Sequence, residues 1–176
     1  MPRNTAPAWD TAVSAEAAWF TAEPPASWPT APPLISTSAG PFDAVQAYRP
    51  FVPPKGKNLF IYRDYGAEQG EEWLASGAQN QWHHHLIAQI LWSFTEATGS
   101  GETMEQHLET AIAAVMARIR GPIGDKTHGG AFTDVGDAHG NGISRVRFVG
   151  DPYDSLEKQE AVEVLIHYTV TDTFTG

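Results

Sequence analysis

The stretch WHHHLIAQILWSF, residues 82–94, places three consecutive histidines at the start of the longest apolar tract of the chain. Successive side chains of a β-strand point to opposite faces of a sheet, so even-numbered and odd-numbered residues fall on different faces. The even-numbered face is strongly apolar and the odd-numbered face is mixed, with Trp82, His84, Leu86, Ala88, Ile90, Trp92 and Phe94 on the first and His83, His85, Ile87, Gln89, Leu91 and Ser93 on the second. This parity predicts a long strand whose even-numbered face lies in the core.

The histidine triplet does not have the geometry of a metal site. Neighbouring strand residues diverge, so three in a row cannot converge on one ion. His83 and His85 share a face, but a bound metal would need a further ligand from elsewhere in the chain. We expect instead that one ring packs beside Trp82 and that the others face solvent or a partner. His83 and His85 would then lie on the face away from the core, where a neighbouring subunit is expected.

Two further strands are predicted at the ends of the regular part of the chain. The segment NLFIYRDYG, residues 58–66, alternates bulky residues and ends on glycine, which indicates a short strand followed by the acidic loop GAEQGEEWLASG. The segment EAVEVLIHYTVTDTFTG, residues 160–176, alternates apolar with polar residues over most of its length. It is therefore predicted to be a strand with one buried face.

One amphipathic helix is predicted between these strands. Thr103 and Gln106 have the spacing of a capping box, and Arg118, Arg120 and Gly121 are typical of a helix end. The apolar stripe has helical spacing and consists of Met104, Leu108, Ala111, Ile112, Val115 and Ile119. A helix with one such stripe packs on one side only.

The segment DAHGNG, residues 137–142, indicates a turn. Its Asn141-Gly142 pair favours a hairpin between the segments GGAFTDVG and GISRVRFVG that flank it. Asp134, Asp137 and His139 could hold a hard cation, but their spacing is not that of an EF-hand or of a calcium-binding repeat. A hairpin loop is the favoured interpretation.

The predicted fold is an α+β domain over residues 59–176. Its element order, β, β, α, β, β, β, predicts a mostly antiparallel sheet of four to five strands with one main α-helix packed on one face. The second face of the sheet would be left mixed.

Residues 1–58 have a different character. They contain 11 of the 13 prolines, which disfavours long helices and central strands and predicts an extended arm. A short helix around TAVSAEAAWF, residues 11–20, is possible. The arm is rich in aromatic residues, so we expect it to dock on its own domain or on a neighbour, with Trp9, Trp19 and Trp28 as anchors. Deleting residues 1–58 is then expected to leave a folded domain and to impair assembly.

The net charge of −10 lies entirely in residues 60–176. Such an acidic domain disfavours a basic footprint for nucleic acid, but it suits a surface past which nucleic acid slides without adhering. The chain contains no cysteine, and its densest apolar run is too short to cross a bilayer. We therefore expect no thiolate chemistry and no membrane partner.

The sequence lacks two common motifs of nucleophilic and metal-dependent catalysis. The patterns G-x-S-x-G and H-E-x-x-H do not occur. We predict that the protein is not an enzyme and has no catalytic residues, no cofactor and no metal. The competing hypothesis is a small metal-dependent or hydrolytic enzyme that uses His83, His85, Asp134, Asp137 and His139.

Three segments resemble the tail terminator, or tail completion, proteins of long-tailed bacteriophages. They are LFIYRDYG through HHHLIAQILWSF, the helix TMEQHLETAIAAVMARIRGPI, and the closing AVEVLIHYTVTDTF. The likeness is in element order, domain size and the long amphipathic strand near the C-terminus, and it covers about residues 58–176. The proline-rich arm departs from it, because many members of the family begin with a helix.

The resemblance implies a structural virion protein, assembled in the host cytoplasm. It implies a homo-oligomeric ring, with six subunits, that caps the tail tube and forms the head-tail joint through which DNA passes. The partners would be the tail tube protein and the neck connector or stopper protein. Another neck ring or a tail tube subunit remains the alternative. In such a ring Arg145 and Arg147, which share one strand face, could pair with carboxylates of a neighbour.

Overall fold

The computed structural model describes residues 9–22, 40–52, 55–68, 70–73, 80–93, 101–121, 126–136, 142–150 and 161–174. In these ranges the elements are α1 (Ala12–Thr21), β1 (Ala44–Ala47), β2 (Lys57–Arg63), β3 (Gly70–Trp73), β4 (Asn80–Ser93), α2 (Gly101–Arg120), β5 (Asp134–Val135), β6 (Ile143–Val149) and β7 (Ala161–Phe174). The predicted α+β class is confirmed.

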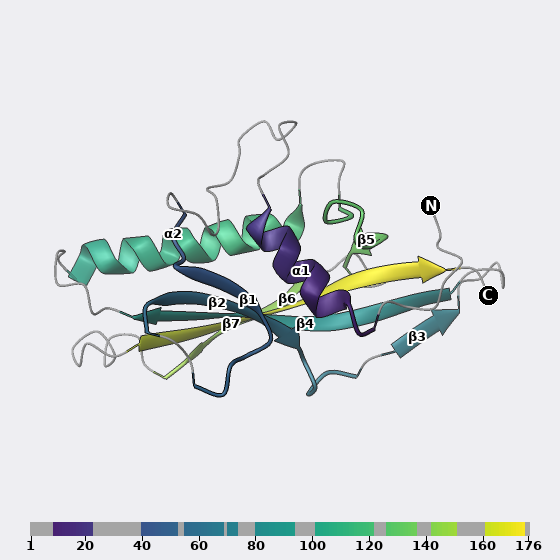
Figure 1. The fold of residues 1–176 in the computed structure, drawn as a ribbon, viewed down its shortest axis with the longest axis horizontal. Helices are drawn as coiled ribbons and strands as arrows, with labels where there is room; N and C mark the ends of the chain where they lie inside the picture. Colours follow the sequence, from purple (N-terminus) through teal and green to yellow (C-terminus); the bar gives the residue numbers. More distant parts are fainter. Residues whose placement is uncertain are drawn as a thin grey trace.

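The seven described strands form one mixed sheet around a long central pair (Figure 1). β4 and β7 are each 14 residues long and pair antiparallel over their whole length. β2 and β3 both pair antiparallel with β4, and β1 pairs parallel with β2. β5 and β6 both pair antiparallel with β7. The sheet is mostly antiparallel, as predicted, and has more strands than the four to five expected.

Two local predictions are corrected by the pairing of the strands. The predicted hairpin is absent from the described residues, because β5 and β6 both pair with successive parts of the long β7 instead of with each other. Residues 137–141 of the predicted turn lie outside the described residues. Part of the predicted acidic loop is the strand β3, because β4 already begins at Asn80 and offers its first residues as a pairing edge.

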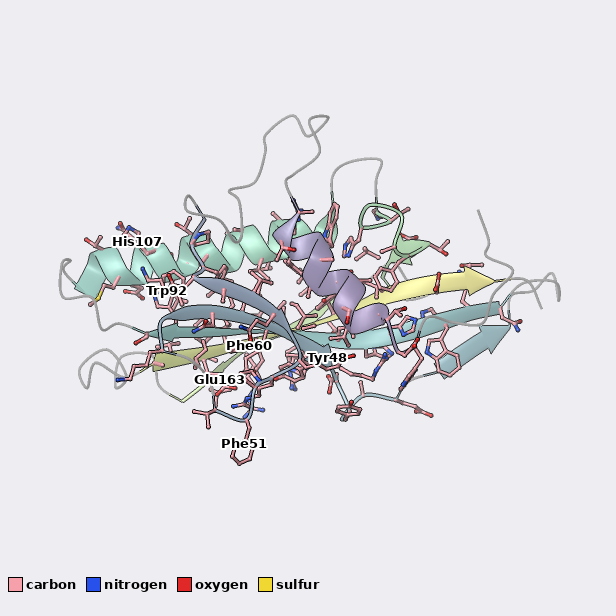
Figure 2. All side chains as sticks on the ribbon, in the orientation of Figure 1. Tyr48, Phe51, Phe60, Trp92, His107 and Glu163 are labelled. Atoms are coloured by element: carbon pink, nitrogen blue, oxygen red, sulfur yellow. The ribbon has the colours of Figure 1, made fainter. Side chains whose placement is uncertain are left out.

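Both helices cover the same face of the sheet (Figure 1). The predicted even-numbered face of β4 is buried there and packs with the equivalent face of β7, so Ala88 and Ile90 lie opposite Ile166 and Val164. From α2, the predicted stripe supplies Leu108, Ala111, Val115 and Ile119 to this core. Figure 2 shows Trp92 between α2 and the sheet and His107 on the outer side of α2.

The start of α2 differs from the prediction. The helix begins at Gly101, so Thr103 is inside it and is not the N-cap residue of a capping box. A capping-box spacing alone does not fix a helix start, since Gly101 and Glu102 can themselves take helical dihedrals.

The predicted arm contributes two elements to the same fold. Val13, Trp19 and Phe20 of α1 are buried in the main core cluster, and β1 extends the sheet beside β2. The expected short helix is therefore present and docks on its own chain. Trp19 is only 5% exposed, so its ring lies inside the fold, whereas Trp9 is 43% exposed. Trp28 lies outside the described residues.

A buried polar network holds α1 against the rest of the chain. Glu16, which is fully buried, accepts hydrogen bonds from His128 Nδ1 at 2.5 Å and from the Tyr168 hydroxyl at 2.8 Å. His128 Nε2 donates to the carbonyl oxygen of Ile119 at 2.8 Å. Because both ring nitrogens face acceptors, both carry hydrogen and His128 is an imidazolium. Burial alone would lower the pKa of His128, but the Glu16 carboxylate and the bond to Ile119 raise it above its ordinary value.

Arg118 joins the other end of α1 to α2. Its guanidinium donates to the carbonyl oxygens of Trp19 and Ala22 and lies 4.2 Å from the centroid of the Trp19 ring. In return, Trp19 Nε1 donates to the Arg118 carbonyl oxygen at 3.1 Å. Burial lowers the pKa of Arg118 to about 10, so the side chain stays charged at neutral pH. Carbonyl groups at the C-terminal end of α1 thus receive hydrogen bonds from a side chain that is 96 positions away from Ala22.

Candidate functional site

The sheet face opposite the helices carries a ladder of histidine and threonine side chains. His83 and His85 lie on this face, as the parity of β4 predicts. His83 Nδ1 lies 3.0 Å from Thr171 Oγ1, and His85 Nδ1 lies 2.9 Å from Thr169 Oγ1. Each imidazole is therefore tied to its cross-strand neighbour on β7. Their role at a subunit interface remains a prediction.

The middle histidine of the triplet faces the core. His84 is fully buried, and its Nδ1 lies 3.4 Å from Arg63 Nη1. Its neighbouring rings are Trp9 and Phe132, with centroid distances of 6.3 and 6.0 Å. Burial first, and the Arg63 charge second, lower the pKa of His84 to about 3. His84 lies on the buried even-numbered face, as the parity of β4 predicts, and its neighbouring rings are Trp9 and Phe132, not the expected Trp82.

The neutral, buried His84 predicts a loss of stability in acid. In the unfolded chain a histidine takes up a proton below about pH 6.5, while the folded chain resists it down to the lowered pKa. Between these limits the unfolded state binds more protons, so this residue lowers the free energy of unfolding by up to about 1.4 kcal/mol for each pH unit of acidification. We expect His84→Gln to show a correspondingly shallower acid slope in urea unfolding series at several pH values. Equal slopes for the two proteins would contradict the assignment.

An open pocket lies on the same face as the histidine ladder, between the end of β2 and strands β6 and β7. Its volume is about 440 Å³, and it is lined by Asp64, Gly66, Ala67, Ser144, Arg145 and His167. His167 Nδ1 lies 2.7 Å from Asp64 Oδ2, and His167 Nε2 lies 3.4 Å from Arg145 Nη2. The Ser144 hydroxyl donates to the His167 carbonyl oxygen at 3.2 Å. The serine hydroxyl is thus turned to the backbone and is not aimed at the imidazole.

Another part of this face is covered. The connection from β1 to β2 passes beneath the sheet on the side opposite the helices (Figure 1). Phe60 lies on this side and is fully buried, whereas Phe51 points away from the sheet and is fully exposed (Figure 2). Gln89 Nε2 donates to Glu163 Oε1 at 2.6 Å. On the rest of this face, His83, His85 and His167 are half-buried, and the pocket opens beside His167.

The strand β6 is the most exposed regular element of the sheet. Every residue after its first is exposed. Arg145 and Arg147 lie opposite His167 and Leu165, so they share one strand face, as predicted, and this face is the open one. Val146 and Phe148 lie on the helix side of the sheet and are 37% and 42% exposed. Among the described strands β6 pairs with β7 alone, so its outer edge has no partner strand there.

The residues of the competing enzyme hypothesis are not brought together in the described part of the chain. Asp134 is exposed, and its Oδ1 accepts the N–H of Val135 at 2.7 Å. Asp137 and His139 lie outside the described residues. In the ranges that the structure describes, no group of three histidine, cysteine, aspartate or glutamate residues is placed to hold a metal ion.

Two side-chain clusters were not predicted from the sequence. Asp64 and His167 are 103 positions apart, and Glu16 and His128 are 112 positions apart. A periodic pattern reports which face a residue occupies, but not which distant residue stands next to it.

Comparison with protein-family models gives no match, and comparison with curated proteins gives none either. Within the described residues, no helix is long and apolar enough to span a membrane.

Proposed function

We propose that this chain is a structural subunit that associates into a closed ring of the tail terminator kind. The ring, of six subunits, would cap a phage tail tube and join it to the head connector in the virion, with DNA passing through the lumen. The observation that carries this proposal is the exposed edge strand β6.

An exposed edge strand with apolar side chains is a template for pairing with another chain. β6 combines the unpaired edge with three exposed apolar side chains, which belong to Val146, Phe148 and Val149. Short strands, bulges or inward charges usually block such edges in monomeric proteins. β6 has an irregularity only near its start, between Ile143 and Arg145, and it then pairs regularly to Val149.

The other end of the sheet supports a ring in particular. β1 is the terminal strand on the opposite side of the sheet from β6. Contact between two different edges is heterologous, and a heterologous contact closes into a ring when its rotation is a whole fraction of a turn. The acidic charge of the domain supports a lumen that repels the DNA backbone. The same edges would also serve another neck ring or a tail tube subunit.

Assembly is expected to depend on the apolar side chains of β6. Native mass spectrometry and negative-stain images should show rings for the full chain. The double variant Val146→Lys, Phe148→Lys should be monomeric at the same concentration, because two ammonium groups at an edge oppose strand pairing. Ala113→Lys, on the exposed side of α2, is the control and should form rings.

A full chain that is monomeric at the concentrations used for imaging would refute the ring. Rings formed equally well by the double variant would refute the part assigned to β6. Far-ultraviolet circular dichroism of each variant establishes that the sheet is still folded.

A further inference from the structure

The pocket on the open face contains a guanidinium with spare hydrogen-bonding capacity. His167 Nδ1 faces an acceptor, Asp64 Oδ2, at 2.7 Å, so this nitrogen carries hydrogen. His167 Nε2 faces a donor, Arg145 Nη2, at the long distance of 3.4 Å. In the described residues this is the single hydrogen bond of the Arg145 side chain. A guanidinium has five N–H donors, so most of them have no partner among the described residues.

We propose that this pocket receives a carboxylate side chain from a neighbouring copy of the chain and that Arg145 binds it. A guanidinium matches the two oxygens of a carboxylate with a pair of parallel hydrogen bonds. The pocket volume of about 440 Å³ admits a side chain, not just an ion. The inference rests on the proposed ring, since it names the contact that the neighbour makes beside β6.

The Asp64 carboxylate favours a side chain of a neighbouring subunit over a free anion as the ligand of this pocket. Its carboxylate lines the same pocket, where it opposes the charge of Arg145 and weakens the binding of anions from solution. Both Asp64 oxygens have partners, since Oδ1 accepts the N–H of Gly66 at 3.0 Å and Oδ2 binds His167. A carboxylate delivered by a subunit already docked on β6 has a high effective concentration and overcomes this opposition.

Charge complementarity identifies the source of the carboxylate. The chain has 21 acidic and 11 basic residues, so the surface of a second copy is rich in carboxylates. Arg145 also belongs to β6 itself, so the pocket is continuous with the proposed interface. The contact with His167 Nε2 favours one position of the Arg145 side chain. Arg145 is thereby a specificity residue for the register in which the neighbouring subunit docks.

The chain offers a matched control for this proposal. Arg147 has the same charge, lies on the same strand face and does not line the pocket. We compare Arg145→Gln, Arg145→Lys and Arg147→Gln in the full chain by sedimentation velocity over a concentration series. Arg145→Gln is expected to weaken subunit association by about tenfold or more, and Arg147→Gln by about threefold at most. Arg145→Lys keeps the positive charge but cannot form the pair of parallel hydrogen bonds. Its loss of association should therefore lie between those of the other two variants.

The outcomes separate the pocket from the ring. Equal weakening by Arg145→Gln and Arg147→Gln would show a general charge effect and would overturn the pocket proposal alone. No weakening by Arg145→Gln in a chain that still forms rings would do the same. A wild-type chain that stays monomeric would overturn the ring and, with it, this contact. Unchanged melting temperatures of the dissociated variants exclude misfolding as the cause of weaker association.

Discussion

Replacing Glu16 by alanine is expected to lower the free energy of unfolding by about 3 to 5 kcal/mol, the usual cost of breaking a buried ion pair by removing one partner. The substitution leaves the His128 imidazolium without its counter-ion and the Tyr168 hydroxyl without its acceptor. Both groups are almost fully buried, so water does not replace the lost carboxylate. Urea unfolding followed by circular dichroism measures the effect.

Two variants of the same helix make this test specific. Ser14→Ala changes an exposed residue of α1 and should alter the free energy of unfolding by less than about 0.5 kcal/mol. Glu16→Gln keeps the size of the side chain and removes its charge. Its loss of free energy of unfolding should lie between those of Ser14→Ala and Glu16→Ala. A loss below about 1 kcal/mol in Glu16→Ala would mean that α1 contributes little to the folded domain.

Deleting residues 1–58 is expected to abolish cooperative unfolding. This reverses the expectation from the sequence that a folded domain remains. The deletion removes the buried Trp19, Phe20 and Phe42, and a large buried side chain contributes about 3 to 5 kcal/mol on truncation. It also leaves Arg118 and His128 buried without their partners on α1. The combined loss is comparable with the whole stability of a typical domain, about 5 to 15 kcal/mol.

Scanning calorimetry of the truncated chain tests this expectation. Deletion of residues 1–8 is the control, because it leaves α1 and β1 in place, and it should keep a sharp thermal transition. If the 59–176 fragment unfolded in a transition as sharp as that of the full chain, α1 would not be a necessary part of the core.

The elements predicted well from the sequence are those with long periodic patterns. β4, β7 and α2 each contain enough apolar residues at one spacing to define a face, and the structure has all three close to the predicted bounds. The elements missed are short. β1 and β3 have four residues each, which is too few for a period to be recognised.

The other features that the sequence did not predict depend on contacts between residues that are distant in the chain. Whether the Asn141-Gly142 pair closes a hairpin depends on which strand offers the better edge, and β7 is long enough to pair with both β5 and β6. Glu16 lies in an alanine-rich helix and has no local feature that marks it as buried and ionised. Its burial follows from His128 and Tyr168, whose positions beside α1 are set by the fold as a whole.

The long-range pairing of β4 with β7 also bears on when the proposed association through β6 could begin. The paired residues are 68 to 94 positions apart, so this ladder closes a long loop and forms slowly. β7 follows β6 in the chain, and among the described strands β6 pairs with β7 alone. During synthesis the outer edge of β6 therefore cannot form in the sheet before residues 161–174 have left the ribosome. A nascent chain that exposes β4 needs protection until then, but it cannot yet recruit a neighbour through β6.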